Sequence, residues 1–509
     1  MVCSIKSFGI NGIDAFEVTV EVDFLGGLPR IDMAGLPDTA IKESRDRINS
    51  AITNSGYEFP RKHFVINLAP ADRKKTGPVY DLPILIAVLK ASEQVNLSTD
   101  GYAFAGEVAL DGKLRGITGA LSMVIEAKEM GYKAFFLPKD NSAEAAVVEG
   151  INVYGAENLR QVCEHLEGKA AIAPAIPQQA IACEFQSDID FSDVRGQTFA
   201  KKALEIAAAG GHSVLLVGPP GTGKSMLAKR VPTILPPMTF EESIQISKVH
   251  SVAGLLRSQK GLVTSRPFRA PHHSVSPAGL SGGGGVPMPG EISLAHNGVL
   301  FLDEFPEFSR SAIETLRQPM EDGVITISRA RSRITYPCNI MVIAAMNPCP
   351  CGYLGHPTKP CICTKQAANR YFSKISGPML DRLDLQTEVL PVDFDTLSST
   401  EKPEASSEIL KRVTAARKIQ QRRFADTDVT CNARMSSAMT SKYCTMSEQA
   451  SAFLRRAFDS LGLSPRAYDR ILRVSRTIAD LDGCDNIEVS HISLAVQYRS
   501  LDRKYFTKA

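Results

Sequence analysis

The chain has 509 residues, more than a single hydrophobic core usually supports, so several domains are expected. Apolar residues make up 44% and charged residues 22%, a composition that excludes wholesale disorder. The formal net charge of +3 is too small to indicate nucleic-acid binding by itself, so any basic surface must be local.

The N-terminal residues and the cysteine content bear on the compartment. The opening MVCSIKSFGING lacks the basic and apolar regions of a secretory signal, and no uncharged apolar run approaches the ~18 residues of a membrane helix. The 11 cysteines are odd in number, which disfavours a disulfide scaffold. We therefore expect a cytoplasmic protein with no membrane partner, in which clustered cysteines are candidate metal ligands.

Residues 1–168 are predicted to form an α/β domain. Apolar and polar side chains alternate over 17–24, the two-residue period of a half-buried strand. A second strand is expected at 64–68 and an apolar helix near 82–91. The domain is followed at 169–187 by an Ala-, Pro- and Gln-rich stretch without a sustained period, which predicts a linker.

A second α/β domain is predicted over 188–390. Its candidate strands are short, continuous apolar runs, which is typical of a parallel sheet covered by helices on both faces. The pattern then becomes helical, so we expect a helical lid domain over 391–509. The candidate strands are SVLLV (213–217), VLFL (299–302) and IMVIAA (340–345).

The run SVLLV leads directly into a glycine loop of the pattern G-x-x-x-x-G-K-[ST]. Its glycines allow successive backbone N–H groups to converge on phosphates, and the helix predicted after it adds a favourable dipole. Lys224 supplies a cation for the phosphates and Ser225 a hydroxyl for Mg²⁺. A chance glycine turn before a helix is the alternative. The loop consists of Gly218, Pro219, Pro220, Gly221, Thr222, Gly223, Lys224 and Ser225.

Two further candidate strands end in polar residues. After 299–302, we expect Asp303 to reach the Mg²⁺ shell and Glu304 to polarise an attacking water. A solvated Asp-Glu pair is the alternative. After 340–345, the amide of Asn347 is expected to orient that water or contact the terminal phosphate, although Asn after a strand is also a common turn residue. The sequence therefore predicts an ATPase that uses ATP and Mg²⁺.

This order of elements, together with SGPMLDRLDL at 376–385 and LSPRAYDRILRVSRTIADLDG at 463–483, resembles AAA+ ATPases. More closely, the whole chain resembles the magnesium-chelatase-like ComM/YifB family through the segments NPCPCG, RAPHHS and SGPMLDR. The resemblance implies that Arg382 is an arginine finger acting on ATP bound to the neighbouring subunit, and that Arg466 is a second sensor that contacts phosphate. A surface salt bridge is the alternative for each arginine.

The same resemblance implies a homohexameric helicase that promotes branch migration on recombination intermediates during natural transformation. Its partners would be single-stranded or branched DNA and recombination proteins. An ATP-driven remodeler of a protein complex, as the chelatase motor subunits are, is the alternative.

Segments 65–86 and 106–122 resemble the proteolytic domain of Lon, which implies a Lon-protease-like (ribosomal S5 domain 2-like) fold for residues 1–168. In that family a Ser follows Gly-Pro and a Lys lies on the later helix, whereas Val79 and Leu121 stand here. An aliphatic side chain can neither attack a carbonyl nor activate a nucleophile. We therefore expect no peptidase activity, and a role in binding DNA or a partner or in organising the ring.

Four cysteines follow the pattern C-x-C-x₉-C-x-C within 349–363. Tetrahedral thiolate coordination suits Zn²⁺, and so short a segment cannot build its own core, which predicts a zinc knuckle. Reduced structural thiols or a redox pair are the alternatives, and Cys338 and His356 are candidate substitute ligands. The four predicted ligands are Cys349, Cys351, Cys361 and Cys363.

Residues 324–336 alternate and carry Arg329, Arg331 and Arg333 at every second position. In a hairpin, we expect these arginines to project from one face and to contact the backbone phosphates of DNA. An exposed edge strand protected by charge is the alternative.

The segment 266–290 contains a run of four glycines, which predicts a mobile loop. Arg266 and Arg269 in this segment are further candidates for DNA contact. The adjacent His272 and His273 are expected to be structural or to face DNA rather than to be catalytic.

Overall fold

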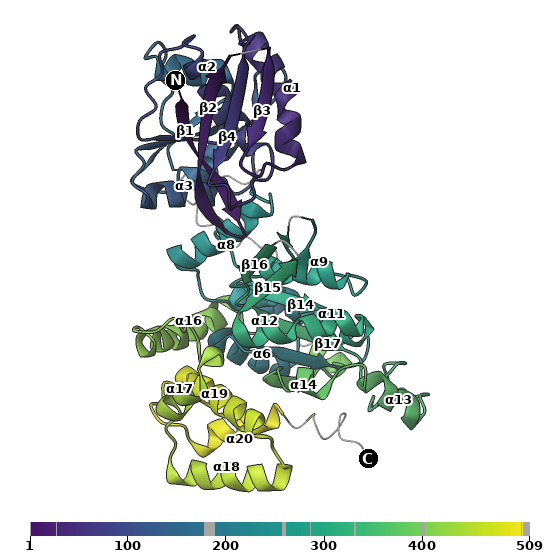
Figure 1. The fold of residues 1–509 in the computed structure, drawn as a ribbon. Helices are drawn as coiled ribbons and strands as arrows, with labels where there is room; N and C mark the ends of the chain where they lie inside the picture. Colours follow the sequence, from purple (N-terminus) through teal and green to yellow (C-terminus); the bar gives the residue numbers. More distant parts are fainter. Residues whose placement is uncertain are drawn as a thin grey trace. The chain divides into compact units, whose positions relative to one another are not determined.

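The computed structural model describes residues 2–26, 28–177, 189–256, 261–285, 287–329, 332–398, 403–499 and 501. The chain divides into two compact units, each with its own hydrophobic core (Figure 1). The first unit comprises Met1–Ala182 and Phe240–Thr264, and the second comprises Cys183–Thr239 and Ser265–Ala509. Residues 240–264, predicted from the sequence to lie in the second α/β domain, are grouped with the first unit.

The first unit is built on a seven-stranded mixed sheet in the order β3-β4-β2-β1-β5-β8-β9. The strands β1, β2 and β4 pair in antiparallel fashion, whereas β5, β8 and β9 continue from β1 in parallel. The expected strands at 17–24 and 64–68 are β2 and β4. The bounds are β1 (Cys3–Asn11), β2 (Asp14–Leu25), β3 (Arg30–Ala34), β4 (His63–Ala69), β5 (Tyr102–Phe104), β8 (Ala134–Pro138) and β9 (Asn152–Ala156), with a separate pair β6 (Glu107–Val108) and β7 (Leu114–Arg115).

Helices cover this sheet, and one of them comes from far along the chain. Helix α8 (Phe240–Val252) packs on α3, where the Gly119 N–H donates to the Ser251 carbonyl at 3.2 Å. The Ser251 hydroxyl also donates to Glu144 at 2.7 Å. These buried polar contacts explain why residues 240–264 belong to the first unit. The remaining helices are α1 (Thr39–Asn54), η1 (Pro78–Tyr80), α2 (Asp81–Ala91), α3 (Ala120–Glu129), α4 (Lys139–Ala145) and α5 (Leu159–Leu166).

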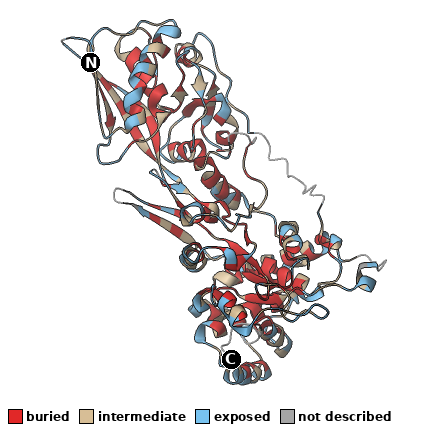
Figure 2. Ribbon diagram, turned by 90° about the vertical axis from the view of Figure 1, so that its right-hand side faces the viewer, coloured by how far each residue is buried: buried red, intermediate tan, exposed pale blue. Residues whose placement is uncertain are grey.

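The second unit contains the parallel sheet that the apolar runs predicted. Its five strands lie in the order β11-β14-β17-β10-β18, and every neighbouring pair is parallel. The three central strands are fully buried, in keeping with helices on both faces (Figure 2). Their bounds are β10 (Val214–Val217), β11 (Phe268–Arg269), β14 (Val299–Leu302), β17 (Met341–Met346) and β18 (Leu385–Glu388).

Short helices and two hairpins connect these strands. The hairpin β15–β16 pairs Val324 with Pro337 and continues to Arg329 opposite Ser332. The elements are η2 (Phe191–Asp193), α6 (Thr198–Gly210), α7 (Lys224–Arg230), η3 (Val231–Ile234), α9 (Pro277–Ser281), β12 (Gly282–Gly283), β13 (Met288–Pro289), α10 (Glu291–Leu294), η4 (Phe305–Glu307), α11 (Arg310–Thr315), α12 (Arg317–Asp322), β15 (Val324–Arg329), β16 (Ser332–Pro337), α13 (Lys365–Phe372), α14 (Gly377–Leu380) and α15 (Phe394–Ser398).

The C-terminal part of the second unit is helical, as the sequence predicted (Figure 1). Helix α16 packs on α6 and α19, which ties this helical region to the parallel sheet. Among the helices of the described ranges, none combines the length and apolar character needed to cross a membrane. The helices are α16 (Ser406–Arg423), η5 (Asn432–Arg434), α17 (Ser437–Tyr443), α18 (Glu448–Leu461), α19 (Pro465–Leu481) and α20 (Val489–Gln497).

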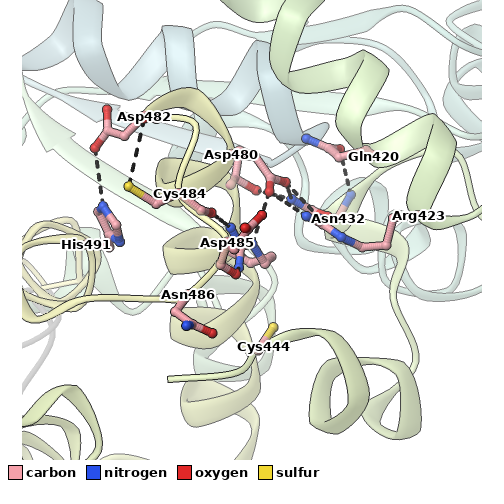
Figure 3. A network of polar contacts seen from close by, with 12 residues as sticks. Gln420, Arg423, Asn432, Cys444, Asp480, Asp482, Cys484, Asp485, Asn486 and His491 are labelled. Atoms are coloured by element: carbon pink, nitrogen blue, oxygen red, sulfur yellow. Dashed lines mark hydrogen bonds and ion pairs between the residues drawn. The ribbon is translucent and has the colours of Figure 1, made fainter. Parts of the chain in front are cut away.

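A buried polar network fixes α19 within this helical region. The Asp480 carboxylate, which is 3% exposed, accepts hydrogen bonds from Arg423 at 2.5 Å and from Asn432 at 2.8 Å (Figure 3). Arg476, one turn earlier on α19, donates to the same carboxylate at 3.0 Å. Separating these helices would leave the buried charge of Asp480 without its partners, which is costly. The network therefore stabilises the packing of α16, η5 and α19 against one another.

Candidate functional site

The glycine loop lies between β10 and α7, at the carboxyl edge of the parallel sheet. Gly218 passes so close to β18 that a Cβ atom there would lie 2.2 Å from the Val389 carbonyl oxygen. Gly223 has a φ of 91°, a conformation that L side chains rarely adopt. Glycine is therefore required at both positions, and the loop conformation follows directly from the sequence pattern.

Lys224 lies beneath this loop. Its ammonium group donates to the carbonyl oxygens of Gly218 at 2.6 Å and Pro219 at 2.8 Å, and to the side-chain oxygen of Asn347 at 3.2 Å. Burial lowers the pKa of Lys224 to about 8, and the nearby charge of Asp303 partly opposes that change. The structure thus brings together the lysine of the loop and the amide that follows β17.

The Ser225 hydroxyl donates to the Asp303 carboxylate at 2.6 Å. Asp303 directly follows β14, and its second oxygen accepts the Glu304 N–H at 2.9 Å. This geometry places two oxygen ligands side by side at the sheet edge, next to the lysine. It is an arrangement that can hold Mg²⁺ beside a phosphate group.

Glu304 has left-handed backbone geometry, with a φ of 52°, and its side chain is 57% exposed. Its carboxylate lies 3.1 Å from Nδ1 of His273, whose ring lies edge-on to that of Phe308. His273, predicted from the sequence to be structural or to face DNA, lies against the expected base in the structure. Because β11 is only two residues long, the periodicity of the sequence did not reveal the strand that delivers this histidine.

The four cysteines of the predicted knuckle come together. Their sulfur atoms all lie within 4.8 Å of one another, and the Cys349 and Cys351 sulfurs are 3.4 Å apart. Although burial alone would raise it, backbone N–H groups and the neighbouring thiols lower the pKa of Cys351, whereas the pKa values of the other three thiols are raised, so one thiolate is favoured in the cluster. Cys338 and His356 are not part of this cluster.

The cysteine cluster packs against the phosphate loop. Gly352, with a φ of 84°, lies so close to Pro220 that a Cβ atom there would be 2.6 Å from the proline ring. Cys349 also follows Asn347 by two residues in the chain. The cluster is therefore positioned to brace both the loop and the amide that contacts Lys224.

Arg382 and Arg466 line one pocket of about 480 Å³ in the second unit. Arg382 is 6% exposed, and its guanidinium group donates to the Pro378 carbonyl at 2.6 Å and pairs with Glu321 at 2.5 Å. Arg466, on α19, is exposed. The pocket is lined by none of the described residues of the phosphate loop, so these arginines form a second cluster apart from Lys224.

The arginine row of the hairpin does not continue through both strands as expected. Arg333 pairs with Ser328, whereas position 329 pairs with Ser332, so positions 329 and 333 belong to opposite faces of the hairpin. The expected single face is therefore wrong for these two positions. Arg333 is exposed, whereas Arg331 and the side chain of Arg329 lie outside the described residues.

The two arginines of the 266–290 segment are engaged within the chain. Arg266 donates to the carbonyls of Pro236 and Asn297, each at 2.7 Å. Arg269 makes a bidentate ion pair with Glu291, with both contacts at 2.7 Å. Internal pairing of this kind anchors the ends of β11 and α10, while both arginines remain partly exposed, so their contact with DNA stays a prediction.

The two positions that the resemblance to Lon singles out are part of the core of the first unit. Val79 lies in η1 and Leu121 in α3, and both are buried. Asp81, close to Val79, pairs with Arg47 at 3.2 Å, and burial raises the pKa of Asp81 to about 7 despite this partner. These contacts stabilise the fold and present no nucleophile at Val79.

Three family models match the chain. The model described as magnesium chelatase, subunit ChlI, matches residues 190–397, the model of subunit ChlI of Mg-chelatase matches 20–141, and the model of the subunit ChlI C-terminal region matches 403–499. Together these matches span most of both units.

Full-length relatives agree with these matches. The chain is 46% identical over 495 residues to the proteins named YifB of Salmonella typhimurium and Escherichia coli, with 97% of this chain and 96% of each relative covered. It is 41% identical over 500 residues to the competence protein ComM of Haemophilus influenzae, with 97% of this chain and 96% of the relative covered.

Proposed function

Since this chain belongs to the ComM/YifB family of magnesium-chelatase-like AAA+ proteins, we propose that it is an ATP-hydrolysing motor that acts on DNA. The observation that carries the ATPase part is the convergence of Lys224, Ser225 and Asp303 at one edge of a parallel sheet. The DNA part rests on the similarity to a relative that is named for competence.

The residues at this edge fit ATP and Mg²⁺. Ser225 and Asp303 offer hard oxygen ligands 2.6 Å apart, the kind that Mg²⁺ prefers, and Lys224 offers an ammonium group to the phosphates. Ser225 and Asp303 would hold Mg²⁺, which would supply positive charge beside the phosphates.

Glu304 is the proposed base, which orients the attacking water and accepts its proton. A positioned base of this kind contributes about 10²–10⁴-fold to the rate. The Lys224 ammonium group donates to the side-chain oxygen of Asn347 as well as to the loop carbonyls, so Asn347 positions the lysine beside the end of β17. His273 contacts Glu304 and is the proposed positioning residue for this base.

The second half of the ATP site is proposed to come from a neighbouring subunit. Arg382 and Arg466 share a pocket that includes no residue of their own phosphate loop, so they are better placed to reach ATP held by a second copy. An arginine supplied in this way stabilises charge on the transferred phosphoryl group and is worth about 10³–10⁵-fold in rate. Repetition of this head-to-tail contact around a closed ring gives the proposed homohexamer.

The proposed DNA substrate is single-stranded or branched, as in the recombination intermediates of natural transformation, with recombination proteins as further partners. On the part of the chain that the structure describes, the exposed Arg333 of the hairpin is the candidate contact for backbone phosphates. Arg266 and Arg269 remain further candidates, although both are paired within the chain. Phosphate contacts of this kind give salt-sensitive, sequence-tolerant binding.

The four-cysteine cluster is proposed to bind Zn²⁺. Four sulfur ligands within 4.8 Å suit tetrahedral thiolate coordination, and the segment 349–363 has too few apolar residues to fold by itself. Bound zinc would supply the local stability that keeps Gly352 against Pro220 of the phosphate loop.

An ATP-driven remodeler of a protein complex is the second candidate function. It is favoured by the match of three magnesium-chelatase models along the chain. Both candidates share the ATP site and differ in what the motor moves.

ATPase activity with and without single-stranded DNA separates the two candidates. We expect stimulation by DNA and, on a forked substrate, ATP-dependent strand displacement that the Lys224→Ala variant lacks. Stimulation without displacement would contradict the helicase proposal. An ATPase that does not respond to DNA would favour the remodeler.

A further inference from the structure

The pocket that contains Arg382 and Arg466 is strongly cationic. Five guanidinium groups and three carboxylates line its volume of about 480 Å³. Two of these carboxylates have other partners, because Asp384 pairs with Arg470 at 2.8 Å and Asp469 accepts from the Ser437 hydroxyl at 2.7 Å. The third carboxylate is that of Glu321. The five basic residues are Arg382, Arg434, Arg466, Arg470 and Arg473.

Glu321 is surrounded by positive charge. It lies on α12, its side chain is 43% exposed, and its carboxylate pairs with Arg382 at 2.5 Å. Although burial alone would raise the pKa of Glu321, the hydrogen bond from Arg382 and the charges of Arg382, Arg466 and Arg470 outweigh it and lower the pKa. The half-exposed carboxylate of Glu321 thus faces three guanidinium groups, of which Arg470 also pairs with Asp384, an arrangement that also suits a phosphate group.

Arg382 itself is incompletely satisfied. It is 6% exposed, and its buried Nε atom has no hydrogen-bond partner, whereas the other nitrogens reach Pro378 and Glu321. A buried guanidinium group without a counter-charge is costly, so the subunit needs an anion at this position. Because Glu321 is half exposed, its carboxylate can return to water at little cost once another anion arrives.

We propose that Glu321 is a built-in substitute for phosphate. Its carboxylate pairs with Arg382 while the subunit is unassembled, and it is displaced by the terminal phosphate of ATP bound to a neighbouring subunit. This inference rests on the proposed function, because it deepens the role of the arginine pocket. Glu321 competes with the incoming phosphate, so it sets how readily subunits join around ATP. Removing the charge of Glu321 should therefore strengthen the binding of polyphosphate to the pocket.

The test measures tripolyphosphate binding by calorimetry, on full-length chains that carry Lys224→Ala so that the phosphate loop is weakened. Adding Glu321→Gln should tighten binding about two- to fivefold, the range expected for the loss of one exposed ion pair. Glu314→Gln is the matched control, because Glu314 pairs with Arg317 and Ser376 and does not line the pocket. Unchanged or weaker binding in the Glu321→Gln chain would overturn the inference.

Arg382→Ala in the same background identifies the site, since it should abolish the gain. A gain that survives this change would also contradict the inference, because the polyphosphate would then lie elsewhere. A second readout uses the otherwise unmodified chain, in which Glu321→Gln should lower the protein concentration that gives half-maximal ATPase activity. If Glu321→Gln tightens tripolyphosphate binding but DNA has no effect on ATP hydrolysis, the inference about Glu321 is supported and the proposed action on DNA is contradicted.

Discussion

The imidazole of His273 lies 3.1 Å from the carboxylate of Glu304, so residues that follow the neighbouring parallel strands β11 and β14 meet near the phosphate loop. Among the described residues, His273 is the polar partner of the carboxylate of this proposed base. It restricts an otherwise exposed side chain to one direction.

His273→Ala should lower kcat about tenfold while the affinity for ATP is retained, because a hydrogen bond to a charged group is worth about 1.5–3 kcal/mol. Steady-state kinetics that separate kcat from KM are the measurement, and His273→Gln should recover part of the rate. The control is His272→Ala, since the ring of His272 packs on His273 while its Nδ1 contacts Ser274 rather than Glu304. Equal kcat values in the two alanine variants would contradict the positioning role.

Glu304→Gln should bind ATP and lose turnover by about 10²–10⁴-fold, because an amide cannot accept the proton of the attacking water. Nucleotide binding and phosphate release are measured on the same preparation. Glu307→Gln is the control, because Glu307 lies on η4 and pairs with Lys374 at 2.9 Å. Normal phosphate release by Glu304→Gln would remove this residue from its proposed role.

Elemental analysis of the purified protein should find one zinc per chain. Cys361→Ser should lose the metal and increase hydrogen exchange over 349–363, because a structural zinc site supplies local folding energy. Cys338→Ser is the control, since Cys338 is buried apart from the cluster. A zinc-free protein with full ATPase activity would contradict the proposed metal site.

The first unit should lose stability as the pH rises from about 4 to 7. The pKa of Asp81 is about 7 in the folded protein and about 4 when unfolded, so the folded state binds more protons in this window. We therefore compare hydrogen exchange of α2 in Asp81→Asn and in the unmodified protein at each pH. The gain in protection from the substitution should be larger at pH 8 than at pH 5. The effect is at most about 1.4 kcal/mol per pH unit.

The matched control for that comparison is Asp111→Asn, because Asp111 is exposed and pairs with Lys113. An equal effect of Asp81→Asn at both pH values would show that this carboxyl group does not titrate in the window.

Much of the second unit could be predicted because its signals are local. The strand ending at Leu302 and the glycine loop ending at Ser225 each combine an apolar run with polar residues whose chemistry is specific, and parallel strands bring such ends together. The cysteine cluster was also visible, because four thiols in so short a segment must lie close together.

The features that sequence did not reveal depend on packing between distant segments or on the position of a turn. His273 follows a two-residue strand that has no periodicity, and helix α8 is recognised as part of the first unit only through its contacts with α3. The hairpin was expected, but its register, which pairs Arg333 with Ser328, decides which positions share a face. The ion pair of Arg269 with Glu291 likewise joins two segments that no local pattern connects.

The central claim is that two copies of the chain build each ATP site together. Lys224→Ala should lack phosphate binding, and Arg382→Ala should bind ATP without hydrolysing it, so each variant alone should be inactive. The most direct test is the ATPase rate of a mixture of the two variants, in which an intact phosphate loop can meet an intact Arg382 across an interface. We expect activity to appear on mixing and to peak near equal amounts. A mixture as inactive as its components, or full activity of Arg382→Ala alone, would contradict the shared site.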